Sequence, residues 1–188
     1  MSLFCGGRMD VFECIRRRRS IRAYKKDHVS EDHLKEILKA ATWAPSAGNL
    51  QSWEFIIVRD HTTKVRLAEA AYGQYFIVEA PVIIVVCANE ERSASRYGDR
   101  GRTLYTIQDT AAAIQNMLLA AYALGYGTCW VGAFNENDVK RILDLPKTVR
   151  PVAIVPLGRP NENPVPPRRL ELKRVVHLEK FGNHPKEF

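Results

Sequence analysis

A run of basic residues near the N-terminus carries the chemistry that the sequence shows most directly. Four arginines, Arg16 to Arg19, precede Ser20, and Arg22 follows two residues later. Guanidinium groups grip phosphate oxygens in pairs and keep their charge at any working pH, and a serine hydroxyl adds a neutral donor. Arg18, Ser20 and Arg22 alternate, so their side chains point the same way if the segment is extended. The run predicts a phosphate site, although a solvated basic face is the plainer alternative.

A second candidate is the loop of small and polar residues between Trp43 and Trp53. Such a loop lets the backbone approach a ligand closely, and the amides of Asn49 and Gln51 both donate and accept hydrogen bonds. A plain connecting turn is the alternative. Together with the arginines, this loop suits a bound nucleotide-like cofactor better than catalysis by a side-chain nucleophile.

The sequence lacks the signatures of several other chemistries. It has no GxGxxG motif, no Walker phosphate loop, no HExxH zinc motif and no GxSxG nucleophile elbow. The cysteines are scattered, which indicates reduced structural thiols and neither a zinc site nor a disulfide frame: Cys5, Cys14, Cys87 and Cys129. We therefore expect no metal and no catalytic side chain.

Helices and strands alternate along the chain and would position these parts. Apolar periodicity predicts five helices. The first spans 10–17, the second runs from Ser30 to before Pro45, and the third spans 62–72. The fourth and longest begins at Thr103, and the fifth runs from a cap at Asn135 or Asn137 to Pro146. Predicted strands span 54–59, 81–88, 128–131 (which runs into a Gly-rich end) and 151–158. The β-branched run 81–88 is typical of a strand covered on both faces. The helix from Thr103 is apolar on too many sides for a surface, which indicates a central position or an interface.

Length and composition favour one compact domain over residues 1–188. No apolar run is long enough to span a bilayer, and the N-terminal stretch from Met1 to Met9 is too short for a signal peptide. Either Met9 is an alternative start site, or residues 1–8 are not native to the protein. We expect a cytoplasmic protein. The net charge of +7 fits a nucleic acid, an anionic ligand or a basic surface. The proline-containing tail from Arg159 keeps apolar residues that need a surface, such as that of a second subunit.

Four segments, in this order, resemble the FMN-dependent nitroreductase family over nearly the whole chain. They read RRRSIR at 17–22, APSAGNLQSW at 44–53, IQDTAAAIQNMLLAA at 107–121 and LGYGTCWVGAF at 124–134. The resemblance implies an α+β fold, a three-layer sandwich with a mixed β-sheet flanked by helices. It also implies an intertwined homodimer with FMN in the subunit interface and with residues 159–188 as a C-terminal arm exchanged with the partner subunit.

The resemblance also implies which residues contact FMN. The phosphate and ribityl side would be held by Arg18, Arg19, Ser20 and Arg22, with Arg168 or Arg169 returning to the phosphate. The isoalloxazine ring would be covered from the other subunit by Pro45, Ser46, Ala47, Asn49 and Gln51. The segment Val131, Gly132 and Ala133 would lie along the ring and offer a backbone N–H near flavin N5.

The activity implied by the resemblance is transfer of hydride from NADH or NADPH, through flavin N5, to an electron-poor small molecule such as a nitroaromatic, a quinone or a free flavin. The cofactor would carry the chemistry. Alternatives within the fold are a reductive dehalogenase or a flavin-fragmenting enzyme. A basic nucleic-acid-binding module is a further alternative, which leaves the two later motifs unexplained. We expect no nucleic-acid and no membrane partner. The polar segment 89–102, expected to be mobile or partly helical, is a candidate wall of the acceptor pocket.

Overall fold

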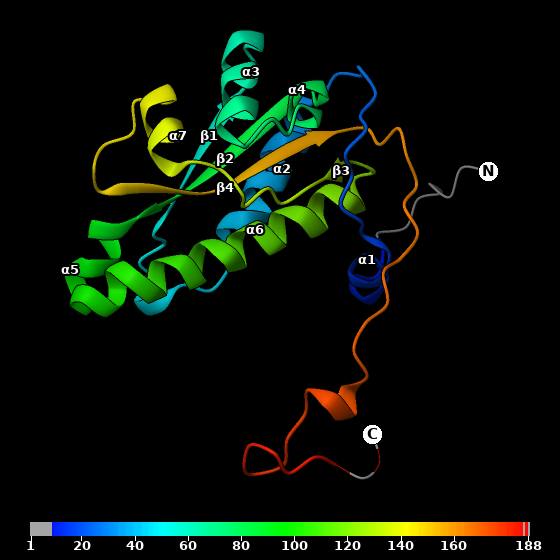
Figure 1. The fold of residues 1–188 in the computed structure, drawn as a ribbon, viewed down its shortest axis with the longest axis vertical. Coiled ribbons are helices and arrows are strands. Elements are labelled where there is room, and N and C mark those ends of the chain that lie inside the picture. The colour runs from blue at the N-terminus through cyan, green and yellow to red at the C-terminus, as the bar shows by residue number, and fades with distance from the viewer. Residues whose placement is uncertain (1–8, 186, 188) are drawn as a thin grey trace.

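A computed structural model describes residues 9–185 and 187 of the chain. Its centre is a four-stranded sheet in the order β1-β2-β4-β3, in which neighbouring strands run antiparallel (Figure 1). The strands are β1 (Trp53–Val58), β2 (Val82–Asn89), β3 (Gly127–Thr128) and β4 (Val149–Gly158). A parallel bridge between Ser20 and Thr128 extends the sheet beyond β3, so the sheet is mixed at this edge. Cys5 and the prefix before Met9 fall in residues 1–8, outside the described residues.

Helices cover both faces of the sheet. They are α1 (Val11–Arg17), α2 (Glu31–Thr42), α3 (His61–Ala70), α4 (Phe76–Glu79), α5 (Glu90–Arg100), α6 (Thr106–Ala123) and α7 (Glu136–Ile142). Three short helical turns, η1 (Ala47–Asn49), η2 (Gly101–Tyr105) and η3 (Leu172–Arg174), complete the described elements. Helices α2 and α6 pack on one face, and α3, α4 and α7 pack on the other. The α+β, three-layer prediction is confirmed.

Strand β2 shows why the sequence builds these layers. Its residues Val82 to Ala88 are all buried, as the β-branched run predicted. Because side chains alternate across a strand, Ile84 joins the core formed with α2 and α6, whereas Ile83 joins the core formed with α3, α4 and α7. One apolar strand thus contributes to two hydrophobic cores.

The longest helix, α6, has more apolar surface than one chain covers. Ile114 and Leu118 are buried against the sheet, but Ile107, Ala111 and Tyr122 remain partly exposed. Nearby α1 also leaves an apolar face uncovered, and its Phe12 side chain is 63% exposed. These surfaces agree with the expectation that α6 contributes to an interface.

Residues after β4 form an arm that leaves the body of the protein (Figure 1). Its start is fastened by a bridge between Tyr24 and Pro160 and by the Asn161 N–H, which donates to the Ala23 carbonyl. Farther along, large apolar side chains are exposed, and Phe181 reaches 94%. The surface that covers this arm stays a prediction. Among the described residues, no helix is both long and apolar enough to cross a membrane.

The segment before α6 is mostly helical, which is one of the two expected alternatives. Helix α5 fills most of it, kinks at Gly98 (φ 55°, ψ −139°) and continues into the π-helical turn η2. Gly101 makes the close packing possible, since a Cβ there would lie 2.5 Å from the Ser93 carbonyl oxygen. As a result, the α-helix begins at Thr106 and not at the predicted Thr103.

Candidate functional site

The arginine segment is extended and pinned to the edge of the sheet. Helix α1 ends at Arg17, and the Ile21 N–H then donates to the Thr128 carbonyl at 2.9 Å. Ile21 is buried against Gly127, where a Cβ would lie 2.7 Å from the Ile21 side chain. Glycine at position 127 thus lets the segment lie close enough to pair with β3. The pairing fixes which side chains share a face.

Alternate side chains of this segment gather around the buried thiol of Cys129. Burial raises the pKa of Cys129, while Arg22, the Ser20 side chain and Arg18 act in the opposite direction. Because the segment is extended where Ser20 bridges Thr128, the alternating side chains of Arg18, Ser20 and Arg22 share one side of it. This arrangement agrees with the alternation in the sequence.

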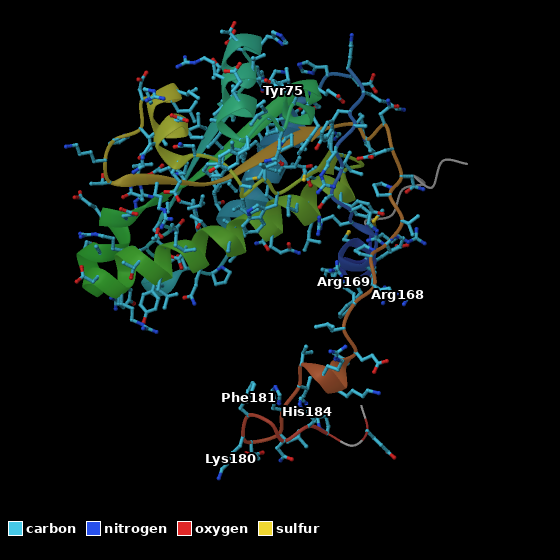
Figure 2. All side chains as sticks on the ribbon, in the orientation of Figure 1. Tyr75, Arg168, Arg169, Lys180, Phe181 and His184 are labelled. Atoms are coloured by element: carbon cyan, nitrogen blue, oxygen red, sulfur yellow. The ribbon has the colours of Figure 1, made fainter. Side chains whose placement is uncertain are left out.

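The C-terminal arm brings a further arginine to the same place. Burial lowers the pKa of Arg18, and the neighbouring positive charges of Arg169 and Arg19 lower it further. Figure 2 shows Arg168 and Arg169 on the stretch of the arm that passes α1. Of the two adjacent arginines, Arg169 is the one whose charge lowers the pKa of Arg18. Which of them contacts a phosphate stays a prediction.

No carboxylate neutralises this cluster. Within residues 9–185 and 187, no salt bridge involves Arg18, Arg22 or Arg169. The nearby Glu162 instead accepts hydrogen bonds from the backbone N–H groups of Arg22 and Ala23. Like charges held together without an anion repel each other, and a bound phosphate relieves that repulsion. The donor set therefore suits a phosphate monoester.

Arg19 has a different environment from its neighbours. Its guanidinium donates to the carbonyl oxygens of Arg16 and Arg18, both at 2.7 Å. These carbonyls lie at the C-terminal end of α1, where a positive charge is favourable. In this chain Arg19 stabilises the end of α1, and its contact with a phosphate stays a prediction.

The small-residue loop is held by one buried carboxylate, Asp109 of α6. The Ala47 N–H donates to Asp109 Oδ1 at 2.9 Å, and the Ser52 hydroxyl donates to Oδ2 at 2.8 Å. Within the loop, the Gln51 N–H donates to Ser46 Oγ at 3.0 Å. Gln51 has a positive φ of 51°, as does Asn49 (55°). Hydrogen bonds to Asp109 and within the loop thus hold it in one conformation.

Asp109 was not among the site residues predicted from the sequence. Its partners lie 57 and 62 positions away, so no local motif relates them. The available indication was one acidic residue on a helix that is apolar on nearly every side, because a buried carboxylate needs hydrogen-bond donors. Asp109 is 5% exposed and has these donors in the loop.

The strand end that follows Cys129 supplies backbone groups. Val131 exchanges backbone hydrogen bonds with Ile154, at 3.0 and 2.9 Å, so its own N–H is used. Gly132 and Ala133 are exposed, and their N–H groups have no acceptor in the described part of the chain. A Cβ on Gly132 would make only ordinary contact, 3.7 Å from the nearest Trp130 ring atom. These two amides are available to a ligand.

The arginines and the loop lie at opposite ends of α6 (Figure 1). Asp109 holds the loop near the start of α6, whereas the arginine segment pairs with β3 just after α6 ends at Ala123. Fourteen residues of α-helix separate the two ends, which corresponds to about 20 Å. One chain therefore does not bring the Pro45–Gln51 loop against the arginine cluster. No group of three or more metal-ligating side chains occurs among the residues described.

Comparison with known proteins agrees with these features. A model of the Nitroreductase family matches residues 15–78 and 72–159. The NADH dehydrogenase of Thermus thermophilus is 36% identical, over 89% of this chain and 95% of that protein. The FMN reductase of Bacillus subtilis is 30% identical, over 93% and 75%. The solved NADPH:FMN oxidoreductase of Vibrio harveyi, complexed with NAD+, superposes with a TM-score of 0.85 at 27% identity, over 93% of this chain and 79% of that one. By sequence and by fold, the chain belongs to the nitroreductase family.

Proposed function

We propose that this protein is an FMN-dependent oxidoreductase that passes hydride from NADH or NADPH to an electron-poor small molecule, such as a nitroaromatic, a quinone or a free flavin. The observation that carries the proposal is the arginine cluster. Burial and the nearby charge of Arg169 lower the pKa of Arg18. Among the described residues, Arg18 has no carboxylate partner. Relatives named as FMN reductase and NADPH:FMN oxidoreductase support the choice of cofactor.

The residues fit FMN by the chemistry of their donors. Arg18, Ser20 and Arg169 would hold the phosphate, and Arg22 lies farther along the same extended segment, over the Phe76 ring at 5.9 Å. The free N–H groups of Gly132 and Ala133 would donate to the edge of the ring system. When bound, FMN supplies a ring that accepts hydride from one substrate and returns it to the next. The protein orients the ring and leaves one face open to substrates.

A homodimer completes this site. Because the 45–51 loop is about 20 Å from the arginine cluster along α6, it would cover the ring of FMN bound to a second copy. That loop would contribute Pro45, Ser46, Ala47, Asn49 and Gln51. The uncovered apolar faces of α1 and α6, together with the arm from residue 159, provide the surface for pairing. Each of the two sites would then contain residues of both chains.

The proposal is tested by the visible spectrum of the purified protein after incubation with FMN and desalting, followed by anaerobic addition of NADH and, separately, NADPH. We expect a yellow protein that bleaches with at least one dinucleotide and that elutes as a dimer. Arg169→Gln should weaken FMN binding about tenfold or more, the value of one charge-assisted hydrogen bond. The matched variant Arg168→Gln removes the same charge one residue away and should have a smaller effect. A protein that stays colourless would refute the proposal.

A further inference from the structure

Four side chains on α5 and η2 form a cluster outside the site described above. We call Arg96, Tyr97, Arg100 and Tyr105 the arginine–tyrosine cluster. The two tyrosine rings meet edge to face with centroids 5.2 Å apart. The guanidinium carbon of Arg96 lies 5.6 Å from the Tyr97 centroid, and that of Arg100 lies 5.3 Å from the Tyr105 centroid. The cluster therefore combines flat aromatic surface with two positive charges.

The cluster is fixed against the 45–51 loop. Arg92, one turn before Arg96, donates to the Gln51 carbonyl at 2.7 Å and pairs with Glu54, which fastens α5 to the loop and to β1. Farther along α5, a Cβ on Gly48 would lie 2.7 Å from the Tyr97 hydroxyl and 3.0 Å from Arg96 Nη1. Arg96 and Tyr97 thus lie directly over the centre of the loop.

The two arginines of the cluster are not neutralised within the described residues. Arg92 has Glu54, and Arg102 lies 4.0 Å from Asp99, but no salt bridge involves Arg96 or Arg100. Arg100 uses only its Nε–H, which donates to the Tyr105 hydroxyl at 2.9 Å. The terminal amino groups of both guanidiniums keep the paired geometry that suits a carboxylate or a phosphate.

We propose that the arginine–tyrosine cluster binds the anionic group of the substrate that enters over the 45–51 loop, so that the enzyme prefers planar substrates carrying a carboxylate or a phosphate. This inference rests on the proposed function, because that function places the loop on the FMN ring. The tyrosine rings pack beside the planar body of the substrate, and Arg96 and Arg100 hold its charge. The anion has two possible sources, the 2′-phosphate of NADPH as the donor and the carboxylate of an acceptor.

Two matched substrate pairs separate these sources. The donor experiment compares NADPH with NADH, which lacks the 2′-phosphate, in anaerobic single-turnover reduction of the FMN-loaded protein. The acceptor experiment compares the Michaelis constants for para-nitrobenzoate and for the neutral para-nitrobenzamide in steady-state turnover. The variants are Arg96→Gln and Arg100→Gln, and Arg96→Lys keeps the charge. Arg141→Gln, on α7 and paired with Asp138, is the control for loss of one positive charge.

We expect Arg96→Gln to raise the Michaelis or dissociation constant about tenfold for NADPH or for para-nitrobenzoate, with less than about a twofold change for the matched NADH or para-nitrobenzamide. Arg96→Lys should retain most of the preference, and Arg141→Gln all of it. The pair that responds identifies the source of the anion. Equal changes for the two members of both pairs, or no change in either pair, would overturn the inference.

A binding measurement keeps the two proposals apart. Calorimetric titration of para-nitrobenzoate into the protein, with and without FMN, requires no turnover, and binding should weaken in Arg96→Gln and at high salt. A protein that is reduced by a dinucleotide, but whose preference for NADPH over NADH and whose binding of para-nitrobenzoate are both independent of Arg96 and Arg100, refutes this inference alone. Failure to bind FMN refutes the proposed function, and if the titration then shows no dependence on Arg96, this inference fails as well.

Discussion

Replacing Asp109 by alanine is expected to release the 45–51 loop. The change leaves the Ala47 N–H and the fully buried Ser52 hydroxyl without their acceptor. Hydrogen bonds to a charged group contribute about 1.5–3 kcal/mol each, and a buried donor left unpaired costs about 1–3 kcal/mol. With partial rehydration of the exposed loop, the two contacts together predict a loss of about 2–4 kcal/mol in the free energy of unfolding. Asp109→Asn keeps one acceptor oxygen and should lose about half as much.

Three measurements test this reasoning. Urea unfolding gives the change in stability, and hydrogen exchange at the Ala47 amide reports the loop itself. In the proposed dimer the FMN dissociation constant should rise as well, because the loop would no longer be fixed against the ring. The double variant with Ser52→Ala should lose less than the sum of the two single changes, since both remove the same hydrogen bond.

A surface carboxylate provides the control. Asp138 pairs with Arg141 on the exposed side of α7, so Asp138→Ala should cost no more than about 1 kcal/mol and leave the loop unchanged. If Asp109→Ala behaved like Asp138→Ala in stability and left exchange at Ala47 slow, the buried carboxylate would not hold the loop, and its assigned role would be refuted.

Three further results are expected. Gly127→Ala places a methyl group 2.7 Å from the Ile21 side chain and should destabilise the protein by about 1–3 kcal/mol by urea unfolding; unchanged stability would show that the arginine segment moves freely. Burial raises the pKa of Cys87 to about 12, so a thiol reagent at neutral pH should label Cys87 only as fast as the protein unfolds; rapid labelling of the folded protein would contradict this. Burial lowers the pKa of Lys64, whose Nζ donates to the Ala80 carbonyl, so the folded chain loses this proton at a lower pH than the unfolded chain does. Relative to Lys64→Met, the wild type should therefore gain stability as the pH rises toward the ordinary lysine pKa of 10.5, and a loss would reverse the assigned sign.

Regular elements with strong local patterns could be predicted from the sequence. The β-branched run at 81–88 became the buried central strand β2, and Asn135 was one of the two predicted caps of α7, where its side chain accepts from the Asn137 and Asp138 N–H groups. The sequence placed Arg18, Ser20 and Arg22 on one side on the condition that their segment is extended, and the bridge between Ser20 and Thr128 meets that condition. In each case a few neighbouring residues determine the structure.

Features that depend on distant contacts could not be predicted in the same way. The approach of Arg169 to Arg18 depends on where an arm with little regular structure passes Arg18. The polar residues of α5 gave no apolar periodicity, yet α5 is held by contacts of Arg92 with Gln51 and Glu54, about 40 positions earlier. Local pattern does not contain such pairings, and they become visible only in the folded chain.

The separation of the arginines and the loop along α6 has a genetic consequence in the proposed dimer. A chain carrying Arg18→Gln lacks one half of every site, and a chain carrying Asp109→Ala lacks the other half, so neither homodimer contains an intact site. When the two variants are mixed and reassembled, one site of a heterodimer contains both substitutions, and the other site contains neither. Random pairing would restore about a quarter of the wild-type sites, which is intersubunit complementation between two defective chains.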